Sequence, residues 1–209
     1  MPQSFYEIAF TPDVKAEQQK HGSRAQYERM QKLRAGEHTL GPDEQHFISL
    51  RDSFYMATVT ETGWPYIQHR GGAPGFLHVL DPTTLAFADL RGNKQYISVG
   101  NLHHEDRVAL FFMDYPNQTR LKILGRAEAI EPGPERSTLF ETLRPPNPAD
   151  VVERAILIHV EGFDWNCPQH ITPRYTEAEI ARELAPLHKR LKDLEADNAA
   201  LRKQLAAHK

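Results

Sequence analysis

Apolar and polar side chains alternate in short runs between residues 53 and 165, which is typical of strands that bury one face. The runs are rich in β-branched and aromatic residues and are separated by turn sequences such as ETGW, GGAPG and DPTT. Only one clear helix, at 93–104, lies among them. This pattern predicts a mainly β protein, a small antiparallel barrel with peripheral helices, because a parallel sheet would alternate strands with helices. The predicted strands are 53–60, 65–69, 76–80, 84–90, 107–115, 119–130 and 153–165.

The first fifty residues are typical of short helices. A cap followed by a proline, Thr11–Pro12, opens one helix. Ser23 and Gln26 form a capping-box pattern that opens a second helix, which we expect to stop at Gly36. A third helix is expected to begin near Pro42. We expect these helices to cover the sheet.

The end of the chain follows a seven-residue pattern. Its hydrophobic stripe places Asn198 at the same heptad position, a, as Leu184. A lone asparagine at a buried a position pairs best with its own copy, which favours a parallel two-stranded coil; the alternative is one amphipathic helix lying on its own domain. We therefore divide the chain into a barrel domain, 1–175, and a helical tail, 176–209. Spacings of four and three residues alternate along the stripe, which contains Ile180, Leu184, Leu187, Leu191, Leu194, Asn198, Leu201 and Leu205.

Charged residues beside this stripe agree with pairing between two copies. Arg190 and Glu195 occupy g and e positions and would meet across the two chains, as would Asp197 and Arg202. Pro186 lacks a backbone N–H, so we expect the helix to break or restart there.

The amino-acid composition limits the classes of protein to which the chain can belong. Of the 209 residues, 40% are hydrophobic and 25% are charged, and the net charge of −3 argues against bulk electrostatic binding to nucleic acid or to an anionic membrane. The one cysteine, Cys167, allows no intramolecular disulfide. Neither a signal peptide nor an apolar run long enough to span a membrane is recognisable, so a cytoplasmic protein is expected.

The glycine-rich loop at 71–75 resembles a phosphate cradle at first sight. It lacks the glycine spacing and the lysine of known nucleotide loops, and a strand follows it rather than a helix. We therefore expect either a plain hairpin turn or a wide turn that brings the backbone close to a flat ligand.

A better phosphate site lies where the strand that ends in Phe87, Ala88 and Asp89 gives way to the predicted helix. A helix beginning near Asn93 would present backbone N–H groups at its N-terminus. Arg91 and Lys94 add cations, and Asn93 and Gln95 add neutral donors, the set that a phosphate prefers. A solvated surface turn is the alternative.

Two further segments carry candidate residues. Arg120 and Lys122 share one face of a strand, where like charges usually face water unless an anion lies opposite. The stretch WNCPQH, at 165–170, offers an aromatic ring, two amides, a thiol and an imidazole. Cys167 and His170 lack the second ligand pair of a zinc site, so no metal is expected. Cys167 also has no identifiable base that would make it a nucleophile.

Four segments together resemble the pyridoxamine 5'-phosphate oxidase-like FMN-binding proteins, which share a split β-barrel: SFYMATVTETGWPYIQHRGG, FADLRGNKQYISVGNL, DRVALFFMDY and TRLKILGRAEAI. The resemblance covers residues 47–160. It implies a homodimer that binds FMN between its subunits. The later WNCPQHITPRY is similar to a signature of one uncharacterised subgroup.

The resemblance also implies a role for particular residues. Those along the flavin would be Gln68, His69, Arg70 and Gly71, and those beside the ribityl chain would be Phe87, Ala88 and Asp89. The phosphate would be held by Arg91, Asn93, Lys94 and Gln95. The partner subunit would contribute Arg120 and Lys122, and the late signature adds Trp165, Asn166, Gln169 and His170 as further candidate contacts.

The chain departs from the oxidases that act on pyridoxamine phosphate. Their Arg-x-Val-Leu-Leu-Lys pattern is replaced by QHRGG at 68–72, and their arginine-lysine pair by Asn93–Lys94. The expected function is therefore an FMN-dependent oxidoreductase with another small substrate. An oxidase and a reductase supplied by NAD(P)H remain equally open. The alternative is a flavin- or haem-binding module without turnover, a sensor or a carrier.

Overall fold

The computed structural model describes residues 4–36, 38–165 and 168–207. The chain forms two compact units. The first contains 1–114 and 118–169, and the second contains 115–117 and 170–209.

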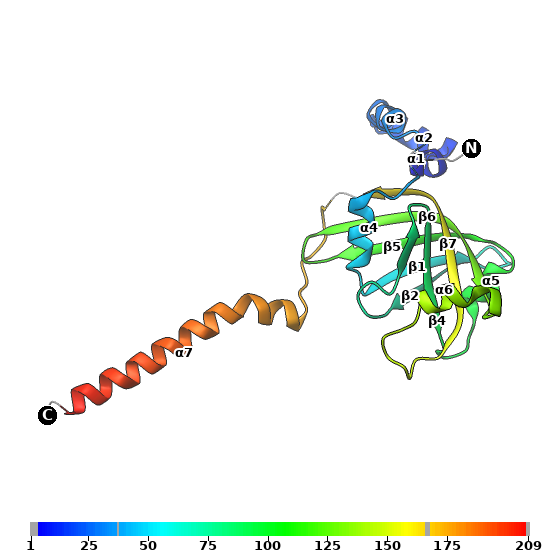
Figure 1. Cartoon of the computed structure of the whole chain (residues 1–209). Coiled ribbons are helices and arrows are strands. Elements are labelled where there is room, and N and C mark those ends of the chain that lie inside the picture. The colour runs from blue at the N-terminus through cyan, green and yellow to red at the C-terminus, as the bar shows by residue number, and fades with distance from the viewer. Residues whose placement is uncertain (1–3, 37, 166–167, 208–209) are drawn as a thin grey trace. The chain divides into compact units, whose positions relative to one another are not determined.

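A curled, seven-stranded sheet forms the centre of the first unit (Figure 1). Its strand order is β2-β1-β5-β6-β7-β4-β3, and every neighbouring pair is antiparallel. The predicted mainly β architecture is therefore confirmed. The strands are β1 (Ser53–Val59), β2 (Pro65–Gly71), β3 (His78–Asp81), β4 (Thr84–Leu90), β5 (Arg107–Asp114), β6 (Thr119–Ile130) and β7 (Val152–Trp165).

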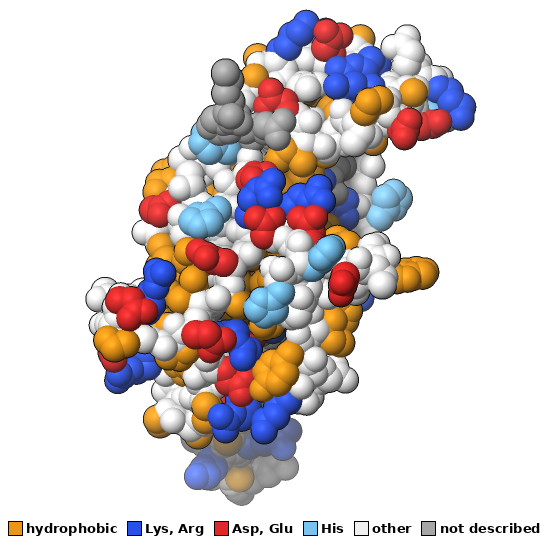
Figure 2. Space-filling view, turned by 90° about the vertical axis from the view of Figure 1, so that its right-hand side faces the viewer, with side chains coloured by type: hydrophobic (Ala, Val, Ile, Leu, Met, Phe, Trp, Pro, Cys, Tyr) orange, Lys and Arg blue, Asp and Glu red, His pale blue; other side chains and the backbone are white. Residues whose placement is uncertain are grey.

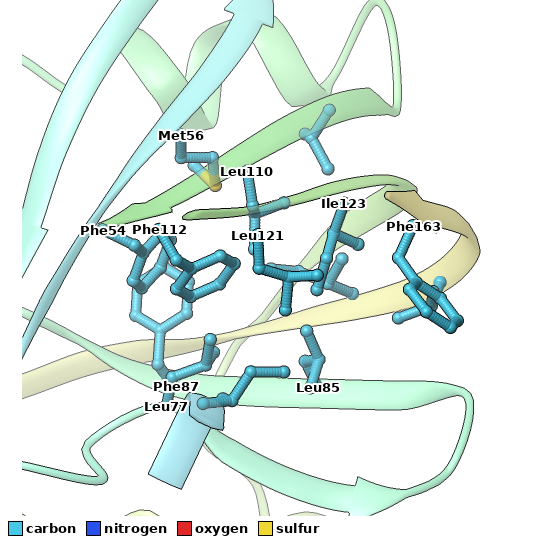
Figure 3. Packing of buried hydrophobic residues seen from close by; sticks show 14 of the residues in the cluster. Phe54, Met56, Leu77, Leu85, Phe87, Leu110, Phe112, Leu121, Ile123 and Phe163 are labelled. Atoms are coloured by element: carbon cyan, nitrogen blue, oxygen red, sulfur yellow. The ribbon is translucent and has the colours of Figure 1, made fainter. Parts of the chain in front are cut away.

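Alternate side chains of these strands fill the interior of the curled sheet (Figure 3). Phe54 lies at the centre of an aromatic cluster, stacked on Phe112 with ring centroids 5.2 Å apart and edge-on to Phe87 at 5.5 Å. Such pairs add about 0.5–1.5 kcal/mol each beyond the burial of their surface. The period of two seen in the sequence thus defines the core face of β1 and β5, whereas β4 is buried on both faces.

Four helices precede the sheet: α1 (Phe5–Ala9), α2 (Pro12–Lys20), α3 (Arg24–Leu33) and α4 (Pro42–Ser49). The Thr11 cap is confirmed, because its side chain accepts a hydrogen bond from the N–H of Val14. The capping box at Ser23 was wrong, since the Ser23 hydroxyl donates to the carbonyl of Gln18 instead. The expectation that these helices cover the sheet is confirmed only for α1 and α4, which pack on it. Helices α2 and α3 pack on each other.

Helix α1 lies directly against β7 at Gly162. A Cβ atom at this position would stand 2.5 Å from the backbone nitrogen of Phe5, so only glycine allows the helix so close. Nearby, the hydroxyl of Tyr6 donates to Asp164 at 2.8 Å. Burial, followed by this hydrogen bond, raises the pKa of Tyr6 to about 12. Helix α1 is thus held to the outer side of the sheet.

Short helices follow the strands β4 and β6. The helix expected from Asn93 begins only at Ile97, as α5 (Ile97–Leu102), because Tyr96 takes a left-handed conformation with φ of 52°. A 3-10 turn, η1 (Pro134–Arg136), leads into α6 (Ser137–Thr142). Leu143, just after α6, is buried in a small second core beside β4 and β7.

The second unit contains one long helix, α7 (Glu177–Ala207). The expected break at Pro186 was wrong, because the helix continues through it. A proline removes one intrahelical hydrogen bond, and at an exposed site water can solvate the carbonyl that loses it. Within the part of the chain that the structure describes, no helix is long and apolar enough to cross a membrane.

The face in Figure 2 carries basic and acidic side chains next to one another. Among the ion pairs of the first unit, the guanidinium of Arg126 lies 2.7 Å from Asp106 and 2.6 Å from Glu161. Exposed pairs of this kind contribute little to stability, about 0–1 kcal/mol each.

Candidate functional site

A polar cavity of about 250 Å³ opens beside β2, the end of β4 and the loop before α5. Every second residue of β2 faces this cavity, because side chains alternate along a strand. Six of the predicted site residues are brought together here: Gln68, Arg70, Asp89, Asn93, Lys94 and Gln95. Other residues in the lining are Tyr66, Leu90, Gly92, Tyr96, Ile97, Ser98, Val99 and Glu153.

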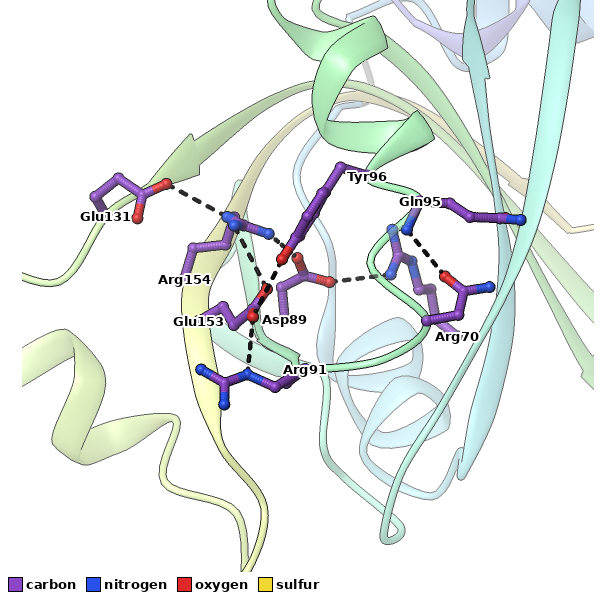
Figure 4. A network of polar contacts seen from close by, with 9 residues as sticks. Arg70, Asp89, Arg91, Gln95, Tyr96, Glu131, Glu153 and Arg154 are labelled. Atoms are coloured by element: carbon purple, nitrogen blue, oxygen red, sulfur yellow. Dashed lines mark hydrogen bonds and ion pairs between the residues drawn. The ribbon is translucent and has the colours of Figure 1, made fainter.

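Asp89 links two arginines at the base of the cavity (Figure 4). One of its oxygens accepts a hydrogen bond from Arg70 of β2 at 3.0 Å, and the other accepts one from Arg154 of β7 at 2.8 Å. All three side chains are at most 17% exposed. The guanidinium of Arg70 also stands over the Phe87 ring at 5.6 Å. A buried carboxylate between two cations fixes the position of Arg70.

A second carboxylate, that of Glu153, lies at the rim of the network (Figure 4). Arg91 donates to it at 3.1 Å and the Tyr96 hydroxyl at 3.3 Å. The hydrogen bond from Arg91 holds the pKa of Glu153 below its usual value, so this carboxylate is ionised at neutral pH. Arg91 itself is 52% exposed and turns toward Glu153 rather than into the cavity.

The loop 91–96 presents donors at the mouth of the cavity. Lys94 and Tyr96 adopt left-handed conformations, with φ of 59° and 52°, which is unusual for residues other than glycine. The side-chain oxygen of Asn93 accepts a hydrogen bond from the N–H of Gln95 at 3.2 Å. Among the described residues, none accepts a hydrogen bond from the N–H groups of 92–94, which are therefore free to bind an anion.

Other predicted residues lie near the cavity without lining it. His69 points to the opposite face of β2, where its ring packs against Tyr55 with centroids 5.6 Å apart. Gly71 ends β2. Phe87 belongs to the main core and Ala88 packs against the small second core. Because His69 follows Gln68 directly, both could not face one side of the strand.

Arg120 and Lys122 do share one face of β6, on the outer side of the sheet. Lys122 is engaged within the chain, since its ammonium group lies 2.9 Å from Asp164 and 4.8 Å from the Phe5 ring centroid. The Nε of Arg120 is buried without a partner among the described residues.

The segment after β7 is only partly described. Trp165 packs edge-on against Phe47 at 4.8 Å and donates to Glu44 of α4 at 2.5 Å. Gln169 and His170 are exposed. Asn166 was predicted to contact the cofactor, and Cys167 was predicted to have no catalytic role. Both residues lie outside the part of the chain that the structure describes.

Five polar residues of the cavity and its network were missed by sequence reasoning. Tyr66 could have been found, because it precedes Gln68 and Arg70 by the strand period of two. The other four depend on tertiary placement, because the pairing of β4 with β7 brings Arg154 opposite Asp89. These four are Tyr96, Ser98, Glu153 and Arg154.

A curled, seven-stranded antiparallel sheet with peripheral helices is the arrangement of a split barrel. The chain belongs to the pyridoxamine 5'-phosphate oxidase family, whose sequence model matches residues 40–158, more than half of the 209 residues. The resemblance expected from residues 47–160 is therefore confirmed. The family consists generally of flavin-dependent oxidoreductases.

Solved structures with similar folds share few residues with the chain. HupZ of Group A Streptococcus is 17% identical with a TM-score of 0.49, over 65% of this chain and 99% of that chain. A candidate pyridoxamine 5'-phosphate oxidase from Lactobacillus delbrueckii is 22% identical with a TM-score of 0.47, over 60% and 93%. An FMN-binding protein from Syntrophomonas wolfei is 12% identical with a TM-score of 0.44, over 58% and 81%. No curated protein sequence matches the chain.

Proposed function

We propose that the chain binds FMN at this cavity, with the phosphate at the loop 91–96 and the ring along β2. The observation that carries the proposal is that one cavity unites three polar residues of β2 with the three donor side chains of the loop. Lys94 supplies a cation, and the free N–H groups of 92–94 supply neutral donors, so the donor set fits a phosphate.

Arg70 would bind the polar edge of the ring system. Arg70 lines the cavity and donates to Asp89 through one terminal nitrogen, so the other terminal nitrogen retains capacity for an acceptor. Asp89 orients it, and the Phe87 ring lies beneath it. A bound flavin would supply hydride or electron transfer, and a fixed cation at its edge would favour negative charge on the ring and raise the reduction potential.

We propose further that the chain pairs with a second copy through the outer face of its sheet, which is the face of β2 opposite to the cavity. The outer face of β1, β2, β5 and β6 carries a row of apolar side chains that a second copy could cover. They are Tyr55, Ile67, Phe111, Met113 and Leu124, of which Ile67 is 63% exposed.

FMN binding can be tested with purified protein, by its visible absorption and by titration of the apoprotein. Replacing Lys94 by Ala should raise the Kd for FMN about tenfold, the value of one charge-assisted hydrogen bond. The Kd for riboflavin, which lacks the phosphate, should not change. Lys32→Ala on α3 is the matched control, because Lys32 is exposed and paired with Glu28. Protein that takes up no FMN, or an equal loss for both ligands, would contradict the proposal.

Pairing through the outer sheet face predicts that Ile67→Asp lowers the molecular mass measured by light scattering toward that of one chain. Leu33→Asp serves as the control, because Leu33 is an exposed leucine on α3. To isolate the barrel, both substitutions are made in a chain that lacks residues 176–209. An unchanged mass for Ile67→Asp would exclude this face as the interface.

The reaction proposed is the oxidation or reduction of a small molecule by the bound flavin, in the cytoplasm, with NAD(P)H as a candidate donor. A flavin-binding module without turnover is the second candidate, because both carboxylates in the cavity are engaged by arginines and neither is a free general base. Mixing with NADH or NADPH without oxygen separates the two. Bleaching of the flavin band within minutes supports the enzyme, and a flavin that no donor reduces supports the module.

A further inference from the structure

Helix α7 carries an exposed apolar stripe. The helix is continuous over 31 residues, which corresponds to about 46 Å at 1.5 Å per residue. None of its described residues is buried. The exposed fractions along the stripe are 47% for Ile180, 39% for Leu184, 63% for Leu187, 54% for Leu191, 49% for Leu194, 59% for Leu201 and 71% for Leu205.

We propose that α7 pairs with α7 of a second copy as a parallel, two-stranded coiled coil. The stripe occupies only the a and d positions of successive heptads, which is the narrow seam of a coiled coil. A helix that lies on a globular domain normally buries a wider face. Pro186 falls at a c position on the outer side, so it leaves the seam intact.

Asn198 decides the direction of the pair. In a parallel coil in register, Asn198 at position a meets its own copy, and the two amides can hydrogen-bond. In an antiparallel coil with the same seam, an a residue meets a d residue, and Asn198 would face Leu187 of the other chain. A buried amide without a partner costs about 1–3 kcal/mol per chain, which favours the parallel arrangement.

Charges on the flanks fit the same register. In a parallel pair, each g residue lies near the e residue five positions later in the other chain. Three successive pairs then bring a carboxylate together with a cation or an imidazole: Glu183 with His188, Arg190 with Glu195, and Asp197 with Arg202. The sign alternates along each flank, so a shift by one heptad would bring like charges together at the last two of these contacts.

Disulfide trapping in the full-length chain tests the pairing. The only native cysteine is first removed with Cys167→Ser, which leaves no background thiol. Leu201→Cys then places a thiol at a d position, where a parallel coil brings it against its own copy. Lys203→Cys, two residues later at an f position on the outer side, is the matched control. Under mild oxidation, Leu201→Cys should form the covalent dimer at least about tenfold faster than Lys203→Cys, through its high effective concentration.

Equal rates of disulfide formation for the two variants would overturn the proposal. The apolar stripe of α7 would then be a surface for a different protein. An antiparallel coil would bring position 201 against position 184 of the other chain. It would therefore give little product with Leu201→Cys alone and rapid product with Leu184→Cys and Leu201→Cys together, which also overturns the proposal. A dimer held only by the barrel does not explain rapid trapping at 201 without trapping at 203, so the coil is tested separately from the flavin site.

Discussion

Replacing Asp89 by Asn should destabilise the barrel through its two arginine partners. The substitution keeps the shape of the side chain but removes the negative charge that Arg70 and Arg154 share. Removing one member of a buried ion pair typically costs about 3–5 kcal/mol, because the remaining charge stays buried. Arg154 keeps a contact with Glu131 at 3.3 Å, and Arg70 is 17% exposed, so we expect the lower end, about 3 kcal/mol.

Thermal and urea unfolding at one fixed protein concentration measure this loss. A cost of about 3 kcal/mol corresponds to a fall in Tm of roughly 6–12 °C for a chain of this size. Arg91→Gln is the control, because it breaks the pair with Glu153 at a side chain that is 52% exposed. Pairs that exposed contribute about 0–1 kcal/mol, so the control should melt close to the unaltered protein.

Combining Asp89→Asn with Arg70→Gln separates this mechanism from a general loss of packing. Once the charge of Arg70 is gone, the loss of the carboxylate should cost less than it does alone. The double variant should therefore be more stable than the two single losses predict, by about 1–3 kcal/mol. Strictly additive losses, or an Asp89→Asn variant as stable as Arg91→Gln, would refute the role given to Asp89.

Three further changes test other parts of the fold. The pKa of Tyr6 is about 12 in the folded protein and 10.0 in the unfolded chain, so the stability that its protonated hydroxyl contributes is lost as the pH rises from 10 to 12. The difference in Tm between Tyr6→Phe and the unaltered protein should therefore shrink over that interval. Gly162→Ala would force a methyl group against the backbone of Phe5, which should lower the free energy of unfolding by about 1–3 kcal/mol. Helix α1 should then detach and become sensitive to limited proteolysis. Removing residues 176–209 should leave the circular dichroism of the sheet unchanged while raising the Kd of dimerisation in equilibrium sedimentation.

The positions of the strands were predictable because apolar and polar side chains alternate within each strand segment. The bounds expected for β4 and β6 are those observed, since each is a single uninterrupted run between turn residues. The start of α5 was not predictable in the same way. Nothing in NKQYISV requires Tyr96 to leave the helix, and its left-handed conformation places the first helical residue at Ile97. The proline of α7 was misjudged because a broken hydrogen bond is tolerated where water can replace it.

The site was predictable only as far as residues close in sequence stay close in space. Gln68 and Arg70 lie two residues apart on one strand, and Asn93 to Gln95 form one loop, so their grouping followed from local pattern. The partners of Arg70 did not follow. Asp89 meets Arg154 because β4 pairs with β7 over a separation of 65 residues, and no local signal specifies that register.

The position of α5 changes the physical basis of the proposed phosphate site. A helix of six residues that begins at Ile97 has a weak dipole, although its first three residues line the cavity. The donors that remain in the loop are the side chains of Asn93, Lys94 and Gln95 and the N–H groups of 92–94. The loop turns through left-handed conformations at Lys94 and Tyr96. Holding two such residues in this conformation costs of order 1–3 kcal/mol each. The contacts of Tyr96 with Glu153 and Arg154 offset part of that cost, so the arginine network and the loop 91–96 form one structural element.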